Sequence, residues 1–231
     1  MKILVQFPTL DRKEKFLKCL SLYDKLSGSN EILFNINCDV EDKSMNNDLT
    51  RQEISNTVVK NKYKINYLEN SNKISAINAS IDEDFDVVVC ASDDMIPVVE
   101  KWDEYISCNM QKHFPDLDGA LHFNDGYAGG DLITLSILGK KLYDYFGYIY
   151  HPDYRSLYCD NEFTEVVYSQ NKVKYIDDII IKHEHYAREG NINSGDYDLA
   201  AKKTLFFSGR DSFVFNKRKE LGFPIERITN D

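Results

Sequence analysis

The sequence places two adjacent aspartates, Asp93 and Asp94, one residue after the apolar run Val87–Ala91. Two carboxylates that face the same solvent edge repel each other, and a divalent cation relieves that repulsion. Carboxylate oxygens are ligands that suit Mg²⁺ or Mn²⁺. The alternative interpretation is a helix-capping turn ahead of Pro97. The abrupt change from apolar to acidic residues favours a cation site.

Two histidines, His183 and His185, follow the apolar residues 179–181. Side chains two residues apart in a strand point the same way, so both imidazoles can reach one metal ion. The simpler interpretation is two surface histidines in a charged segment. With Glu189 they also match the His-x-His-x-x-x-Glu spacing of cupins. A cupin, however, needs many short antiparallel strands, and this chain alternates strands with helices.

Further candidates lie at the expected starts of two helices. Asp160 begins one of them, where an acid can act as a general base if the site is partly desolvated, or can simply stabilise the helix dipole. Lys73 and Asn78 belong to the other, where they can contact a phosphate or a nucleobase. A solvent-exposed lysine is the simpler interpretation of Lys73.

The elements that must position these residues alternate in the first half of the chain. Apolar runs predict strands at 3–7, 31–37, 64–68 and 86–91, and amphipathic segments predict helices at 16–26, 54–59 and 74–81, with a fourth that Pro97 opens. This alternation predicts a mainly parallel sheet flanked by helices. Ligands bind such sheets beyond the carboxyl ends of the strands. Pro8, Thr9, Asp39 and the segment Ser92–Asp94 therefore share one edge.

The second half of the chain is less regular. It predicts strands at 119–123 and 173–181, a glycine-rich loop at 126–130, and helices at 140–146, 159–170 and 198–207. Neither a repeat nor a linker interrupts the chain. We expect one α/β domain over residues 1–231.

Composition narrows the class of ligand. The 231 residues include 28 Lys and Arg against 38 Asp and Glu, so the net charge is 28 − 38 = −10. A chain this acidic is a poor match for a nucleic-acid backbone or an anionic membrane surface, and it needs a cation to bind a diphosphate. A local basic face remains open as an alternative, formed by Lys202, Lys203, Arg210, Lys217, Arg218 and Lys219.

The cysteines and the apolar segments indicate the compartment. Five scattered cysteines without a Cys-x-x-Cys pair predict buried, reduced thiols. The chain opens without a secretory signal and holds no apolar stretch of about 20 residues. We therefore expect a cytoplasmic protein without a membrane span.

In chain order these motifs resemble the GT-A-fold glycosyltransferases, the family-two-like members most of all, from Lys2 to about His185. Pro8-Thr9-Leu10-Asp11-Arg12 is similar to the strand end that holds the nucleotide in that family. Asp39 lies where the family often places an acid on the base. Lys73–Asn78 is similar to its Lys-x-x-Ala-x-Asn segment beside the nucleotide.

The same resemblance extends to the metal and acceptor sites. Ser92-Asp93-Asp94 lies at the position of the family's Asp-x-Asp metal motif, with Ser92, or Ala91 in the other register, in place of the first acid. Asp160 lies where inverting members have their general base, although Cys159 replaces the usual acid before it. His183 or His185 matches the late histidine that completes the metal shell in many members.

The resemblance implies a function and its cofactor. It implies a Mn²⁺- or Mg²⁺-dependent transferase that moves a sugar, with inversion, from a UDP-sugar to a carbohydrate or other hydroxyl acceptor. It divides the chain into a nucleotide-binding half (about 1–112), an acceptor-side half (about 113–190) and a C-terminal helical tail (about 191–231).

Three other functions compete with this one. They are a non-catalytic nucleotide-sugar-binding module, a transferase that modifies nucleic-acid bases, and a sugar nucleotidyltransferase. The last is disfavoured because no glycine-rich phosphate loop follows the first strand. The sequence makes no prediction of the oligomeric state.

Overall fold

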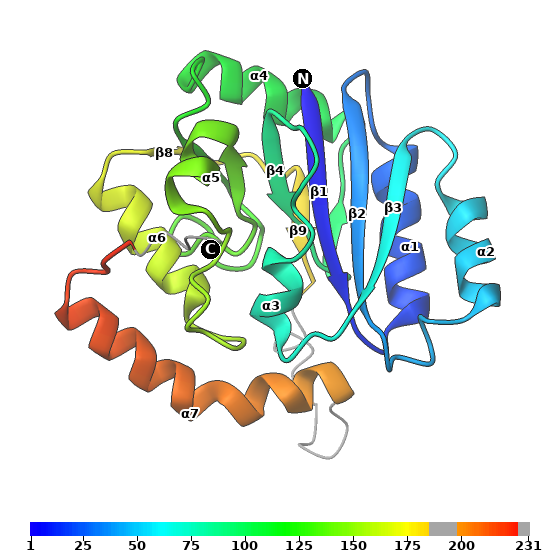
Figure 1. The fold of residues 1–231 in the computed structure, drawn as a ribbon. Coiled ribbons are helices and arrows are strands. Elements are labelled where there is room, and N and C mark those ends of the chain that lie inside the picture. The colour runs from blue at the N-terminus through cyan, green and yellow to red at the C-terminus, as the bar shows by residue number, and fades with distance from the viewer. Residues whose placement is uncertain (185–197, 226–231) are drawn as a thin grey trace.

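The computed structural model describes residues 1–184 and 198–225. Its main sheet has seven strands in the order β3-β2-β1-β4-β7-β6-β8, and β5 pairs with β9 in a separate two-stranded sheet (Figure 1). The strands are β1 (Lys2–Thr9), β2 (Glu31–Asp39), β3 (Lys62–Leu68), β4 (Val87–Cys90), β5 (Met95–Pro97), β6 (Ala120–Phe123), β7 (Ile137–Gly139), β8 (Val173–Ile176) and β9 (Ile181–His183). In the main sheet only β7 runs antiparallel to its neighbours. The predicted α/β architecture with a mainly parallel sheet is confirmed.

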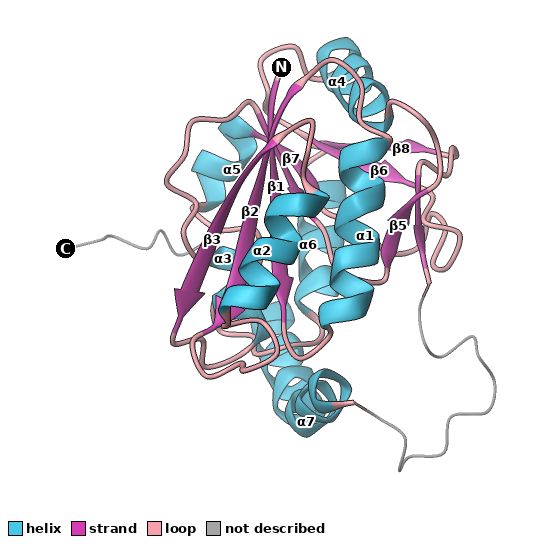
Figure 2. Cartoon of the chain, turned by 90° about the vertical axis from the view of Figure 1, so that its right-hand side faces the viewer, coloured by secondary structure: helices cyan, strands magenta, loops and turns pink. Residues whose placement is uncertain are grey.

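Helices cover both faces of the main sheet, and Figure 2 shows α1 and α2 on the side opposite α5. The helices are α1 (Lys13–Lys25), α2 (Asp48–Thr57), α3 (Lys73–Asn78), α4 (Trp102–His113), α5 (Lys140–Phe146), α6 (Cys159–Ser169) and α7 (Leu199–Glu220). Alternate residues of a strand face opposite sides. Val5 therefore packs in one hydrophobic cluster with α1, α2 and α4, whereas Leu4 packs in the other with α3, α5 and α6.

The centre of the sheet follows directly from the sequence. All four residues of β4 are buried, as expected for a β-branched run covered on both faces. On α1, Phe16, Cys19 and Tyr23 are buried on one face, and Trp102 of α4 donates a hydrogen bond from Nε1 to the carbonyl of Tyr23. These contacts hold α1 and α4 together on the same face of the sheet.

A row of buried amide side chains holds α3 on the other face. Asn35 Nδ2 donates to Gln6 Oε1, and Asn66 Nδ2 donates to the side-chain oxygens of both Asn35 and Asn37. Gln6 and Asn37 in turn donate to backbone carbonyls of residues 76–79 at the end of α3. Because buried amides must be satisfied, this network fixes the position of α3 relative to β1 and β2.

Two predicted boundaries are wrong. Pro97 does not open a helix: Met95–Pro97 is a strand, Val98 donates a backbone hydrogen bond to Ile180, and α4 begins only at Trp102. Residues 173–181 are not one strand but contain β8 and the start of β9, which pairs with β5. In both cases pairing between distant segments overrides the local pattern.

The C-terminal helix is longer than predicted and lies across the carboxyl ends of the strands (Figure 1). It begins at the N-cap Asp198, whose carboxylate accepts from the amide of Ala201, and it continues through Gly209 to Glu220. Its buried residues Asp211 and Arg218 contact other parts of the chain, so tertiary contacts support its second half.

Two expectations from composition can be compared with the structure. All five cysteines are free thiols and four of them are buried, while Cys108 is exposed. In the ranges 1–184 and 198–225, no helix has the length and apolar character needed to cross a bilayer.

Candidate functional site

A pocket of about 250 Å³ lies between the carboxyl edge of the sheet and α7. Its walls come from the ends of β1, β2 and β4, the beginnings of α3 and α6, and the first turns of α7. Ten of the residues that the sequence singles out line this pocket: Pro8, Thr9, Arg12, Asp39, Lys73, Ser92, Asp93, Asp94, Asp160 and His183. Residues as far apart in sequence as Pro8 and His183 thus share one concave surface.

Asp94 and His183 are neighbours in this pocket. The His183 Nε2 atom lies 3.7 Å from Asp94 Oδ2, and its Nδ1 atom lies 3.4 Å from Asp125 Oδ2. Burial raises the pKa of Asp94, but the nearby imidazole of His183 and a hydrogen bond from the Ser92 hydroxyl outweigh it, so the pKa is lowered overall. Burial lowers the pKa of His183, but the two carboxylates outweigh it and raise the pKa to about 9. Without a metal ion, the imidazole is therefore a cation between two anions.

The pairing of β9 with β5 explains why the imidazole of His183 lies close to Asp94. Strand β9 pairs with β5, which places His183 opposite Met95, one residue after Asp94. The backbone amide of His183 donates to the carbonyl of Asp125, and that of Glu184 donates to the carbonyl of Asp94. Both carboxylate partners of the imidazole thus belong to segments that β9 also contacts through its backbone.

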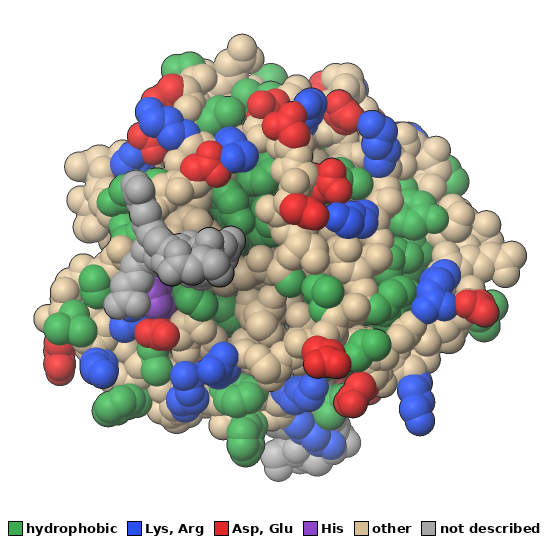
Figure 3. All heavy atoms as spheres, in the orientation of Figure 1, with side chains coloured by type: hydrophobic (Ala, Val, Ile, Leu, Met, Phe, Trp, Pro, Cys, Tyr) green, Lys and Arg blue, Asp and Glu red, His purple; other side chains and the backbone are tan. Residues whose placement is uncertain are grey.

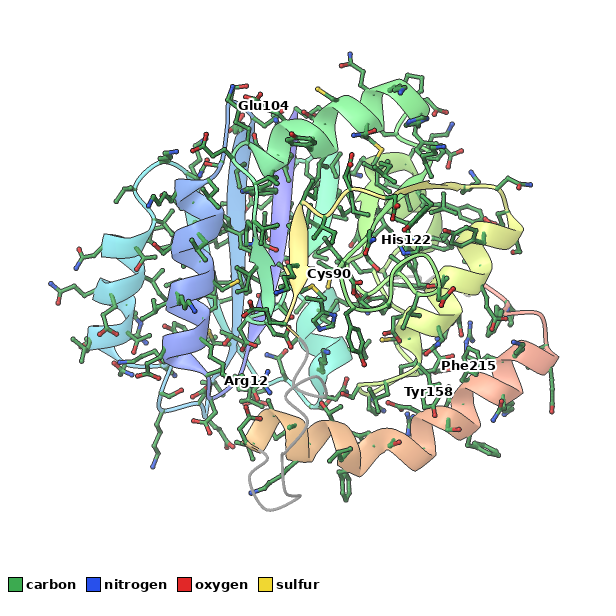
Figure 4. The ribbon with its side chains drawn as sticks, turned by 180° about the vertical axis from the view of Figure 1, so that it is seen from behind. Arg12, Cys90, Glu104, His122, Tyr158 and Phe215 are labelled. Atoms are coloured by element: carbon green, nitrogen blue, oxygen red, sulfur yellow. The ribbon has the colours of Figure 1, made fainter. Side chains whose placement is uncertain are left out.

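Asp93 has a different set of partners. Arg12 Nη1 donates to Asp93 Oδ1 at 3.0 Å, and the same guanidinium donates to both carboxylate oxygens of Asp198 at 2.7 and 3.0 Å. Burial raises the pKa of Asp93 against the opposing effect of Arg12. Figure 4 shows Arg12 beside the first turn of α7. Arg12 therefore connects the end of β4 to the N-terminus of α7.

Asp160 lies in the first turn of α6, in the wall of the same pocket. Its Oδ1 atom accepts a hydrogen bond from the amide of Asn161. Burial raises its pKa, while the positive charge of Lys73 acts in the opposite direction. A partly desolvated carboxylate with a raised pKa at the edge of a pocket has the properties of a general base.

One predicted site residue is not brought into this group, and a second is not among the described residues. Asn78 does not line the pocket: its side chain donates to the carbonyl of Tyr150 and accepts from the amides of Ile149 and Tyr150. It connects α3 to the segment before α6. The second residue, His185, lies outside the described residues.

Three residues that organise the site were not predicted from the sequence. Asp125 is almost fully buried, accepts from the amides of residues 127–129, and is the second partner of His183. Arg155 lines the pocket, and Asp211 of α7 accepts hydrogen bonds from the backbone amides of residues 155–157. Only the Asn124-Asp125-Gly126 turn has a local sequence signal, and that signal indicates a turn rather than a site.

The side chains of the pocket fit a divalent cation only in part. Among the described residues, no three Asp, Glu, His or Cys side chains come together as a preformed metal site. Asp94 and His183 nevertheless offer one oxygen and one nitrogen ligand on the pocket wall. Mn²⁺ accepts both kinds of ligand, and Mg²⁺ sites often take one or two protein ligands with substrate phosphates. The donor set therefore fits a cation that a bound diphosphate helps to hold.

Comparison with known proteins gives the fold. No family model matches the chain, and no curated protein matches it in sequence. It is similar to the mannosyltransferase PcManGT from Pyrobaculum calidifontis, solved in complex with GDP-Man and Mn²⁺, with a TM-score of 0.61 and 10% identity over 78% of this chain and 56% of that one. It is also similar to S. aureus TarS 1-349 in complex with UDP-GlcNAc, with a TM-score of 0.58 and 16% identity over 84% of this chain and 62% of that one.

This chain has a GT-A glycosyltransferase fold. It spans less than two thirds of the length of either of these structures. At such low identities the likeness establishes the fold, and the activity has to be argued from the pocket itself.

Proposed function

We propose that this protein is a metal-dependent glycosyltransferase that moves a sugar from a nucleoside diphosphate sugar, a UDP-sugar in our assignment, to a hydroxyl acceptor with inversion of configuration. The observation that carries this proposal is one pocket that holds both the Asp94–His183 pair and Asp160. The Asp94–His183 pair would bind the cation that accompanies a diphosphate, and Asp160 would act as the base. The pocket lies at the carboxyl edge of a parallel sheet, where ligands bind in such folds.

The nucleotide would lie against the ends of β1 and β2. Thr9 is buried at the pocket wall, and its hydroxyl has no hydrogen-bond partner within the described chain. Asp39 lies 3.7 Å from the ammonium group of Lys203 and can accept a hydrogen bond from a base or a ribose. Lys73 also lines the pocket, where its ammonium group can contact a phosphate oxygen. These groups support a nucleotide as the ligand.

Asp94 and His183 would hold the cation, which when bound neutralises charge on the diphosphate leaving group. This assigns the adjacent carboxylates different tasks. Asp94 faces the imidazole, whereas Asp93 is engaged by Arg12 and keeps that guanidinium at the pocket. His183 would hold the cation through its neutral imidazole, since only the unprotonated ring nitrogen is a ligand.

Asp160 would act on the acceptor. A carboxylate in this position can accept the proton of the acceptor hydroxyl as the oxygen forms its bond to the anomeric carbon. The bond from that carbon to the diphosphate oxygen breaks on the opposite face, which inverts the configuration. A positioned general base typically contributes about 10² to 10⁴ in rate.

The test is release of UDP from UDP-sugars in the presence of Mn²⁺, combined with calorimetric measurement of UDP binding. Asp160→Asn should leave the dissociation constant of UDP unchanged and lower turnover by a factor of about 100 or more. Asp144→Asn, at an exposed position of α5, is the matched control and should change neither quantity. Full turnover by Asp160→Asn would refute the assignment of the base. UDP-sugar binding by the wild type without any turnover would instead support a non-catalytic binding module.

A further inference from the structure

The outward side of α7 presents two large apolar side chains to solvent. Phe206 is 81% exposed and Phe213 is 69% exposed. The two are seven residues apart, so they lie on the same side of the helix. Figure 3 shows apolar and basic side chains together along the lower edge of the molecule, where Figure 1 places α7. Isolated exposed apolar residues are ordinary, but two phenylalanines on one ridge need an explanation.

The helix cannot turn to bury these rings because its inward side is fixed. Asp211 is fully buried and accepts hydrogen bonds from three consecutive backbone amides, those of residues 155–157. Arg218 is buried and donates to both carboxylate oxygens of Glu162 in α6. On the same inward side, Phe215 lies against Tyr158, with ring centroids 5.7 Å apart (Figure 4). The exposure of Phe206 and Phe213 is therefore a stable property of the fold.

Two lysines flank the two rings on this ridge. Lys202 precedes Phe206 by four residues, and Lys217 follows Phe213 by four residues. Arg210 lies between the rings in sequence, but its Nη1 atom donates to the carbonyl of Asp153 and to the buried Asp211. Lys202 and Lys217 have no ion-pair partner within the ranges 1–184 and 198–225. Five of the six Lys and Arg residues of α7 are exposed (Lys202, Lys203, Arg210, Lys217 and Lys219), whereas its one exposed acid is Glu220. Three of these five cations pair with acids, Lys203 with Asp39, Arg210 with Asp211 and Lys219 with Glu165. In a chain of net charge −10, Lys202 and Lys217 therefore carry the unpaired positive charge of this helix, among the residues that the structure describes.

We propose that this ridge of α7 (Lys202, Phe206, Phe213 and Lys217) docks the protein on an anionic lipid surface. Phenylalanine side chains partition into the boundary between headgroups and acyl chains, and the flanking cations are attracted to anionic headgroups. The net charge of the whole chain argues against such a surface, but only charges within about a Debye length of the lipid contribute strongly.

The apolar residues favour lipid over nucleic acid as the occupant. Leu205 and Leu221 are also exposed on or directly after α7, and aliphatic side chains offer no ring on which a base can stack. The surface is also a convex helix rather than a groove that could follow a phosphate backbone.

Docking through this ridge would leave the pocket close to the lipid. Ala201, Lys203 and Thr204 line the pocket from α7. The pocket would then lie within about one helix diameter, roughly 10 Å, of the bilayer surface.

The test is flotation of the protein with phosphatidylcholine vesicles that contain phosphatidylglycerol, with pure phosphatidylcholine vesicles in parallel. The wild type should float with the anionic vesicles and not with the neutral ones. The double substitution Phe206→Ser and Phe213→Ser should lower the partition coefficient about tenfold or more, because it removes both apolar side chains from the boundary layer. Lys202→Gln with Lys217→Gln should lower it about 25-fold, since each cation near an anionic surface contributes a factor of about five.

The matched control is Leu49→Ser, which removes a 61% exposed apolar side chain from α2 and should leave flotation unchanged. Circular dichroism should show the same melting temperature for all variants, because every substituted side chain is exposed. The proposal is overturned if the wild type does not bind anionic vesicles or if the phenylalanine variant binds equally well. It is also overturned if the phenylalanines instead govern binding to single-stranded DNA or the mass of a dimer measured by light scattering.

Discussion

The ion pair between Arg218 and Glu162 joins α7 to α6, and Glu162 lies two residues after Asp160. Removal of this ion pair should lower the free energy of unfolding. Arg218 Nε and Nη2 donate to the two carboxylate oxygens at 2.8 and 2.9 Å, and the side chains are only 6% and 7% exposed. The hydroxyl of Tyr154 donates to the same carboxylate at 2.7 Å. Both charges are thus desolvated and depend on each other.

Arg218→Met should lower the free energy of unfolding by about 3 to 5 kcal/mol, because it leaves the Glu162 carboxylate buried without its cation. For a chain of this length, each kcal/mol shifts the melting temperature by about 2 to 4 °C, so a decrease of roughly 10 °C is expected. The double variant Arg218→Met with Glu162→Leu should recover most of the loss, since it leaves no buried charge.

The assay is urea unfolding followed by far-UV circular dichroism for the wild type, both single variants and the double variant. Lys219→Met is the matched control on the same two helices. It breaks the pair with Glu165, whose side chains are 53% and 41% exposed, and it should cost about 1 kcal/mol or less. If Arg218→Met changes stability no more than this control, the argument from burial is refuted.

Three other predictions concern the pocket. Asp94→Ala should weaken Mn²⁺-dependent UDP binding about tenfold or more in calorimetry while leaving metal-free binding unchanged; equal affinities with Mn²⁺ would exclude Asp94 as a ligand. Burial raises the pKa of Asp160, and a general base acts only when it is deprotonated. The plot of kcat against pH should therefore rise with an apparent pKa above 3.8, the ordinary value for an aspartate. An apparent pKa at or below 3.8 would contradict the assignment. Asp211→Ala should cost about 3 kcal/mol in urea unfolding, since it strips the acceptor from the amides of residues 155–157; a loss below about 1 kcal/mol would contradict this.

Local patterns were enough to predict the strands that carry the pocket. The continuous β-branched run of β4 is typical of a central strand that is covered on both faces. The aspartates that follow this run were therefore expected at the end of a strand. Pro8, Thr9 and Asp39 follow from the same reasoning. Their gathering in one pocket is a consequence of parallel strand order.

The sequence by itself determined the alternation of strands and helices and the edge of the sheet at which polar residues collect, because these depend on periodicity within a few residues. Only the tertiary structure decided that Asp93 faces Arg12 while Asp94 faces His183, and that α7 extends to Glu220. Those contacts join residues 81 to 89 positions apart, or depend on buried partners such as Glu162. No local pattern encodes them, because their free energy arises only when distant segments are brought together and desolvated.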